Sequence, residues 1–268
     1  MFSLSSLGIE IEGVCVAQLS NTRRTRFAAA NEPDGDLEAK QQQFLRAMQR
    51  YEQHAGYGRF NFAISVWNVG LQGCLLVQLF ALPMAWYGHV LALLFGCFIA
   101  DFLNGIVHLY MDHNHNYRSI AGPLIAAFHL HHDTLRYADK PIYQVYFNES
   151  GYKVWLAPYL LATAALLHFT ATPPFLMGLM IHVGILSSLA EVSHFLCHNS
   201  DAPSTRVLQR MGLLVSVKHH ERHHQDDNVN YAFLNGWSDP LINWLARRFC
   251  SGYSTTTDKH SALYNRHL

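Results

Sequence analysis

The sequence predicts an all-α fold: an integral-membrane four-helix bundle with a histidine-rich di-metal site at its cytoplasmic end and peripheral interfacial helices. Two observations support this prediction. Half of the 268 residues are hydrophobic and only 14% are charged, and the apolar residues gather in long segments. The chain also contains 18 histidines, and many of them lie in clusters near the ends of those segments. A buried helical core of a soluble protein is the alternative explanation of the apolar segments.

The chain divides into a polar tail, a membrane domain and a second tail. Residues 1–59 form the N-terminal tail, with a short amphipathic helix expected at 37–53. Glu10 and Glu12 interrupt the apolar start, and the arginines of 23–26 follow it, so the order of charges is not that of a secretory signal peptide. Whether residues 1–30 are another kind of targeting segment stays open. The membrane domain is expected at 60–250, and 251–268 form the C-terminal tail.

The membrane domain contains four apolar segments, most of which approach the roughly 20 residues that a helix needs to cross a bilayer. Between Arg59 and Arg118 the only charged residues are Asp101 and Asp112. The segments therefore predict four spans. They lie at about 61–82, 87–111, 154–171 and 174–198.

The positive charges favour a membrane over a soluble core. No Lys or Arg lies at 60–117 or at 154–205, so the connections at 82–88 and 170–174 carry none. If the chain crosses the membrane four times, these two connections lie on one side, and every Lys and Arg lies on the other side. The positive-inside rule makes that side cytoplasmic, or stromal in a plastid. Beyond the fourth span, an interfacial amphipathic helix is expected at 203–216, a further helix through HHERHH at 219–224, and another helix within 231–249.

Four clusters of potential metal ligands follow this topology. They are His108 with Asp112, HLHH at 129–132, His194 with His198, and HHERHH at 219–224. Residues three or four apart share one face of a helix, and neutral imidazole is the commonest metal ligand in proteins. All four clusters fall on the positively charged side of the predicted topology. The pattern indicates one metal centre with many ligands, which would hold two ions.

Other classes of protein fit less well. Lys and Arg together equal Asp and Glu, at 19 each, so no basic excess indicates nucleic acid. A single zinc ion needs three or four ligands, and HHERHH lacks the glutamate placement of an HExxH motif. A transporter would place its ionisable groups near the middle of the bilayer. The five cysteines form no CxxC pair and indicate no zinc or disulfide framework.

Four pieces of the chain together resemble the Kua-type family of membrane lipid desaturases, which includes plasmanylethanolamine desaturase, the bacterial CarF proteins and a plastid desaturase of phosphatidylglycerol palmitate. The pieces are DFLNGIVHLYMD (101–112), FHLHH (128–132), HFLCH (194–198) and LQRMGLLVSVKHHERHHQDDNVNYAFLNGW (208–237). The resemblance covers about 85–245. It departs from the usual family pattern at Leu109, where a Trp is common, and after His132, where the first proline comes only at Pro141.

The resemblance implies a set of metal ligands. They are His108, Asp112, His131, His132, His194, His198, His220, His223 and His224. His219 stays open as a ligand or as a neighbour of one. Supporting roles around the ligands are expected for Asp101 and Glu191, which share helix faces with ligand histidines, and for His129.

The resemblance also implies the chemistry. It is the insertion of a double bond into an acyl or alkyl ether chain of a phospholipid, with two iron ions, O2 as co-substrate and an external electron donor, either ferredoxin or cytochrome b5. Which of the two chain types is the substrate stays open. The alternatives are a membrane di-iron hydroxylase and a non-enzymatic, metal-stabilised membrane accessory or signalling protein.

Overall fold

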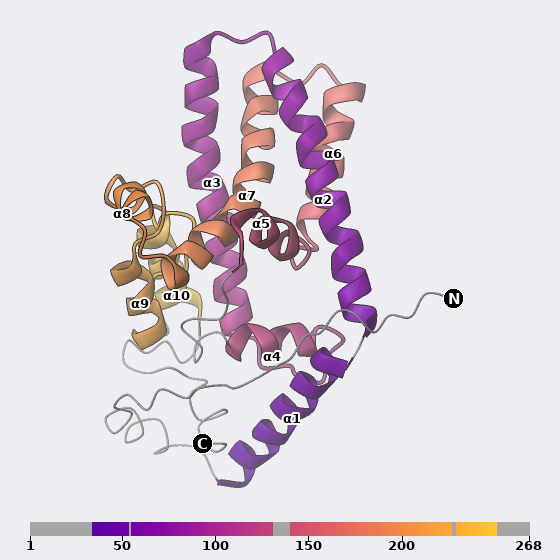
Figure 1. Ribbon diagram of the computed structural model, residues 1–268, viewed down its shortest axis with the longest axis vertical. Coiled ribbons are helices and arrows are strands. Elements are labelled where there is room, and N and C mark those ends of the chain that lie inside the picture. Colours follow the sequence, from indigo (N-terminus) through magenta and orange to yellow (C-terminus); the bar gives the residue numbers. More distant parts are fainter. Residues whose placement is uncertain (1–33, 54, 131–139, 227–228, 251–268) are drawn as a thin grey trace.

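The computed structural model describes residues 34–53, 55–130, 140–226 and 229–250; the two expected tails therefore lie largely outside the described residues. The described residues form ten helices and no strand, which confirms the predicted all-α class. The long apolar helices stand side by side, and most of the shorter helices lie around one end of this group (Figure 1). The ten helices are α1 Asp34–Gln53, α2 Ala55–Ala81, α3 Trp86–Asp112, α4 Gly122–Leu130, α5 Ile142–Ser150, α6 Leu156–Phe169, α7 Pro174–Asn199, α8 Pro203–Arg210, α9 Val217–Asp226 and α10 Asp239–Phe249.

Three of the described helices are long and apolar enough to cross a membrane: α2 from Gly58, α3 and α7. The third expected span, at 154–171, is shorter than predicted, because α6 has only 14 residues. At about 1.5 Å per residue it is roughly 21 Å long, less than the roughly 30 Å of bilayer hydrocarbon. Turns at 151–155 delay its start, and the extended backbone of Thr170 ends it. The structure therefore has three full-length candidate spans and one short apolar helix.

Helices α3 and α7 pack closely together and carry most of the candidate ligands. Small residues on α3 permit the close approach: Ala92, Gly96 and Ala100 are buried, and a Cβ added to Gly96 would lie only 2.7 Å from the Cβ of His182 on α7. The apolar core between α2, α6 and α7 is a cluster of buried side chains. Its members are Leu75, Leu79, Leu156, Leu160, Met177 and Ile181.

Helix α5 is joined to α2 and α7 by buried hydrogen bonds. Asn68 on α2 donates to the carbonyl of Ser150 at 2.8 Å, and Gln72 donates to the hydroxyl of Ser188 on α7 at 2.8 Å. Tyr146 on α5 donates in turn to the side-chain oxygen of Gln72 at 2.6 Å. These bonds satisfy polar groups that would be costly to bury alone, and they fix α5 across the two spans.

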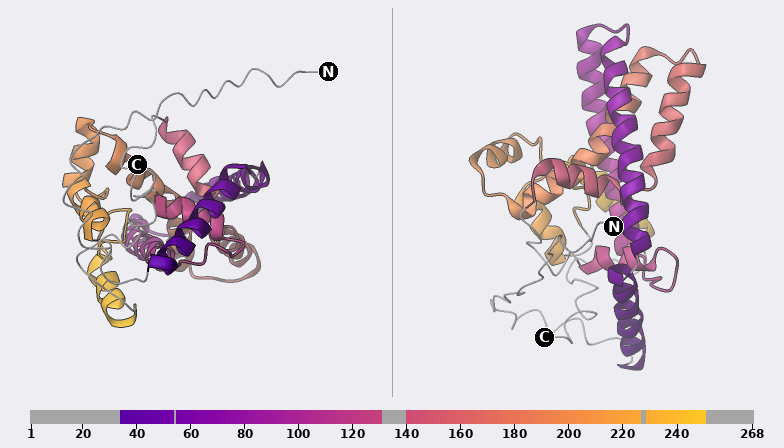
Figure 2. Two further views of the ribbon diagram at one scale, coloured as in Figure 1. Left: turned by 90° about the horizontal axis from the view of Figure 1, so that it is seen from below. Right: turned by 45° about the vertical axis from the view of Figure 1, so that its right-hand side comes forward.

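The chain after α7 packs against the later halves of α3 and α7 (Figure 2). Helix α8 is shorter than the helix expected at 203–216: it ends at Arg210, and Gly212 takes a positive φ of 70° in the following turn. Residues 229–238 are not helical, and α10 begins only at Asp239, with Pro240 in its first turn. We call residues 229–238 the connecting segment.

Candidate metal centre

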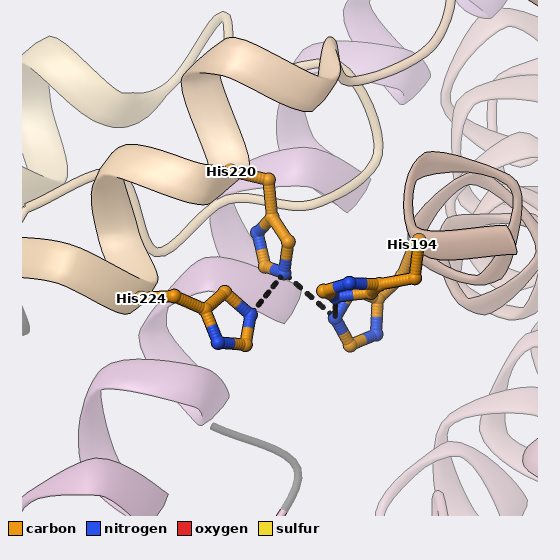
Figure 3. A group of neighbouring side chains, drawn as sticks. His194, His220 and His224 are labelled. Atoms are coloured by element: carbon orange, nitrogen blue, oxygen red, sulfur yellow. Dashed lines mark hydrogen bonds between the residues drawn. The ribbon is translucent and has the colours of Figure 1, made fainter. Parts of the chain in front are cut away.

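Four histidines from two helices form the first ligand group. His194 and His198 are one turn apart on α7, and His220 and His224 are one turn apart on α9. The Nε2 atom of His220 lies 2.8 Å from Nε2 of His194 and 2.9 Å from Nε2 of His224, as Figure 3 shows. His198 Nε2 lies 3.1 Å from that of His194. One ligand atom from each residue lies within 4.8 Å of the others.

The first group has the chemistry of a metal site. Burial lowers the pKa of His220 well below its usual value, and the neighbouring histidines lower it further, so the ring is neutral. A ring nitrogen can donate or accept one hydrogen bond, yet His220 Nε2 faces two other Nε2 atoms within 3 Å. A cation bound between the four nitrogens would accept a lone pair from each. The residues therefore fit a metal ion.

Two histidines and one carboxylate form the second group. Oδ2 of Asp112 lies 3.5 Å from Nε2 of His108, its neighbour on α3, and 3.5 Å from Nε2 of His223 on α9. All three side chains are buried. Two imidazoles and one carboxylate are the protein ligands typical of non-haem iron(II) oxygenases, so this set fits iron.

Backbone carbonyls orient the two histidines of the second group. Nδ1 of His108 donates to the carbonyl of Tyr231 at 2.8 Å, and Nδ1 of His223 donates to that of Val229 at 2.9 Å. Because a carbonyl only accepts, each ring carries its proton on Nδ1 and turns the lone pair of Nε2 toward Asp112. Burial lowers the pKa of His223 to about 4, which also favours the neutral ring.

The two groups are adjacent. His220 of the first group and His223 of the second are three residues apart on α9, and their ring centroids are 5.6 Å apart. The rings of His108 and His220 are also close, at 6.4 Å. Helix α9 therefore supplies ligands to both groups, which lie close enough together for a centre with two metal ions.

Asp101 was expected to support the ligands, either by accepting a ring N–H or by a structural hydrogen bond. In the structure its carboxylate holds the connecting segment. It accepts backbone N–H groups from Leu234, Asn235, Gly236 and Ser238 at 2.9–3.3 Å, and the hydroxyl of Ser238 at 2.7 Å. Since the same segment supplies the carbonyls that orient His108 and His223, Asp101 supports the second group indirectly.

Gly105 brings the connecting segment close to α3. A Cβ at this position would lie 3.2 Å from the backbone of Ala232 and 2.4 Å from Cδ1 of Ile242. The close neighbours of Gly105 are thus the connecting segment and α10, rather than another membrane helix.

Glu191 lies beside the first group and forms a partly buried ion pair. Its Oε1 is 2.8 Å from Nζ of Lys153, and its Oε2 is 3.9 Å from Nδ1 of His194. The distance to His194 is longer than a hydrogen bond. Lys153, which is itself buried, also donates to the side-chain oxygen of Asn104 and lies over the ring of Phe233.

His219 points away from both groups. Its Nε2 lies 2.5 Å from Oδ2 of Asp239, whose other oxygen accepts the N–H of Ala232 at 2.8 Å. Burial raises the pKa of Asp239, whereas the bond to His219 lowers it. Asp239 is not predicted from the sequence; its only signal is the Ser-Asp-Pro sequence, which is typical of a helix start.

The HLHH cluster is described only in part, because His131 and His132 lie outside the described residues. His129 is fully buried, and both of its ring nitrogens are engaged. Nε2 donates to the carbonyl of Met111 at 2.8 Å, so Nδ1 accepts from the hydroxyl of Tyr117 at 2.8 Å. Burial lowers the pKa of His129 to about 3, and the ring stays neutral. It fixes α4 to the end of α3, next to Asp112.

The fold and the two ligand groups define a class: helical proteins with membrane-spanning candidates and a buried histidine-rich centre. The model of the lipid desaturase domain family matches residues 97–247, more than half of the chain. The protein belongs to this family, the Kua-type lipid desaturases, and the family supports an oxidoreductase of the lipid desaturase or hydroxylase type. No curated protein and no solved structure matched the chain.

Proposed function

We propose that the protein is an O2-dependent di-iron desaturase that inserts a double bond into an acyl or alkyl ether chain of a phospholipid. The observation that carries this proposal is the pair of adjacent ligand groups linked by α9, in a chain of the lipid desaturase family. Bound there, two iron ions would supply the activation of O2 that the removal of two hydrogens from adjacent carbons requires.

The residues of the two groups have distinct tasks in this proposal. The first group would hold one ion through four imidazoles, and the second would hold the other through His108, Asp112 and His223. We propose His131 and His132, which lie outside the described residues, as further ligands of the centre, as the family resemblance implies. They directly follow α4, and His129 fixes the end of that helix beside Met111, one residue before Asp112.

The electrons would come from a separate protein, either ferredoxin or cytochrome b5. We propose that the centre lies at the cytoplasmic face of the membrane, or at the stromal face in a plastid. The distribution of Lys and Arg supports this orientation, since both connections at the far end, 82–85 and 170–173, carry neither. A lipid headgroup can stay hydrated at that face while its chain lies among apolar helices.

Lipid analysis of a host that expresses the full chain tests the function. We expect a new double bond or vinyl ether in the phospholipids, and its loss in His223→Ala, which removes a ligand of the second group. The matched control is His168→Ala, since His168 is an exposed residue of α6. A hydroxylated product would instead show the hydroxylase. Lipids that match an empty host, with iron and a donor supplied, would refute the enzyme and favour an accessory protein.

A further inference from the structure

An apolar groove of about 240 Å³ lies between α3, α7 and the chain that follows α8. Its lining includes Leu94 and Cys97 of α3, Leu186 and Leu189 of α7, Leu214 and Trp237. Leu94, Leu189 and Trp237 remain 37–48% exposed. Both helices are candidate membrane spans, so the groove opens where lipid hydrocarbon would be its neighbour. It is smaller than the roughly 300–1,000 Å³ of a typical ligand pocket and would hold part of a chain.

The inner end of the groove reaches a side chain that contacts both ligand groups. Cys97 and Leu186 pack against a buried cluster that contains Phe233. The ring centroid of Phe233 lies 5.5 Å from that of His108 and 5.3 Å from that of His194. One aromatic ring therefore stands between the apolar groove and the two candidate metal sites.

A second, basic pocket is lined by residues that come just before and just after Leu213 and Leu214, which line the groove. Arg206, Arg210 and Lys218 line this cavity of about 240 Å³. The chain turns at Gly212, directly after α8. Residues 213–214 then line the groove beside α3 and α7, and residues 216–218 line the basic pocket. Arg206 also pairs with Asp201 at 3.4 Å, but the lining itself contains no acidic residue, and the charges of Arg210 and Lys218 match that of a phosphate group.

We propose that these two cavities form one phospholipid site: the groove holds a hydrocarbon chain, the basic pocket binds the phosphate, and Phe233 closes the inner end of the groove against the metal centre. The site rests on the proposed function, because it would present a lipid chain to that centre. Charge complementarity favours a phospholipid over an uncharged lipid, and the position on two spans favours a lipid over a soluble partner.

Photo-crosslinking to the purified full chain in detergent tests the site. The probe is phosphatidylglycerol with a diazirine in one acyl chain, and the labelled peptides are identified by mass spectrometry. We expect labels on the peptides that carry Leu94 and Leu189. Leu189→Trp should fill the groove and lower this labelling at least fivefold, whereas Leu176→Trp should not. Leu176 is also an exposed leucine of α7, 44% exposed, but it lies near the start of the helix and outside the groove.

The phosphate is tested with diacylglycerol that carries the same diazirine chain. We expect phosphatidylglycerol to label the groove at least fivefold more than diacylglycerol, and the double variant Arg210→Ala/Lys218→Ala to remove that preference. Equal labelling by the two probes would overturn the phosphate pocket. Labelling of other peptides, unchanged labelling in Leu189→Trp, or a crosslink to a second copy of the chain would overturn the groove.

The two proposals can fail separately. Crosslinking measures binding alone and needs neither turnover nor an electron donor. A chain that forms a double bond in the host but is not labelled in the groove would refute only this site. A chain that is labelled there but leaves the host lipids unchanged would refute only the desaturase.

Discussion

His219 and His220 are neighbours in the sequence, but their side chains have different partners. His220 is fully buried, and its Nε2 faces those of His194 and His224. His219 is partly exposed and forms its close contact with Asp239. At the residue scale, the direction in which an imidazole points therefore separates a candidate ligand from a structural contact, although both belong to HHERHH.

This difference predicts opposite results for two adjacent substitutions. His220→Ala removes a ligand of the first group and should lower the iron bound per chain by about half or more. His219→Ala removes a contact with Asp239 and should leave iron binding close to that of the natural chain. Iron measured by elemental analysis on both purified variants checks this. Equal iron loss in the two would contradict the assignment.

Asp101 gives a second prediction at this scale. In Asp101→Asn an amide replaces one acceptor oxygen, and its NH2 group would face backbone N–H donors. Each lost hydrogen bond to a charged group is worth roughly 1.5–3 kcal/mol, so we expect a clear fall in the thermal unfolding temperature. Asp201→Asn is the matched control, because the Asp201 side chain is 75% exposed. An unfolding temperature of Asp101→Asn equal to that of this control would refute the role of Asp101.

At the element scale, the connecting segment links the fold to the metal centre. The carbonyls of Val229 and Tyr231 orient His223 and His108, while its later residues donate to Asp101. The segment is not helical, so its carbonyls are available to side chains instead of to a helical ladder. A displacement of the segment would therefore turn two ligands at once.

A glycine on α3 tests this link. Gly105→Ala places a methyl group against Ala232 and Ile242, and overpacking of this kind typically costs about 1–3 kcal/mol. We expect a lower unfolding temperature together with reduced iron binding, since the segment must move. Gly73→Ala on α2 is the control, because its added Cβ has no neighbour within 4 Å. A Gly105→Ala chain with the stability and iron of the control would contradict the tight packing.

At the scale of the whole molecule, α3 and α7 run in the same direction and bring their ends together at the candidate centre. The connections 82–85 and 170–173 lie at the opposite ends of these helices (Figure 1). If the helices cross a bilayer, the centre and these two connections face opposite sides. The absence of Lys and Arg from both connections then predicts that the centre is cytoplasmic.

Single-cysteine labelling tests this orientation. In a background without the native cysteines, a membrane-impermeant maleimide should label Ala171→Cys from the outside of intact cells. It should label Ser204→Cys only after the membrane is opened. Both positions are exposed, so access to the side chain is matched. Labelling of both from the same side would refute the proposed topology.

The sequence predicts those parts of the molecule that depend on near neighbours in the chain. The pairs His108–Asp112, His194–His198 and His220–His224 follow from helical spacing, and each pair meets in the structure. The supporting contacts do not follow from spacing: Tyr231 reaches His108 across 123 positions, and Ser238 reaches Asp101 across 137. The span predicted at 154–171 is longer than α6, because apolar composition alone does not reveal the turns that precede Leu156.

The metal content of the purified full chain tests the central claim most directly. The two ligand groups predict about two iron ions per chain, and about one or fewer in His220→Ala. Elemental analysis together with Mössbauer spectroscopy of iron-57 protein would count the ions and show whether they are paired. Two iron ions in a coupled pair are the expected result, and a single zinc ion per chain would contradict it.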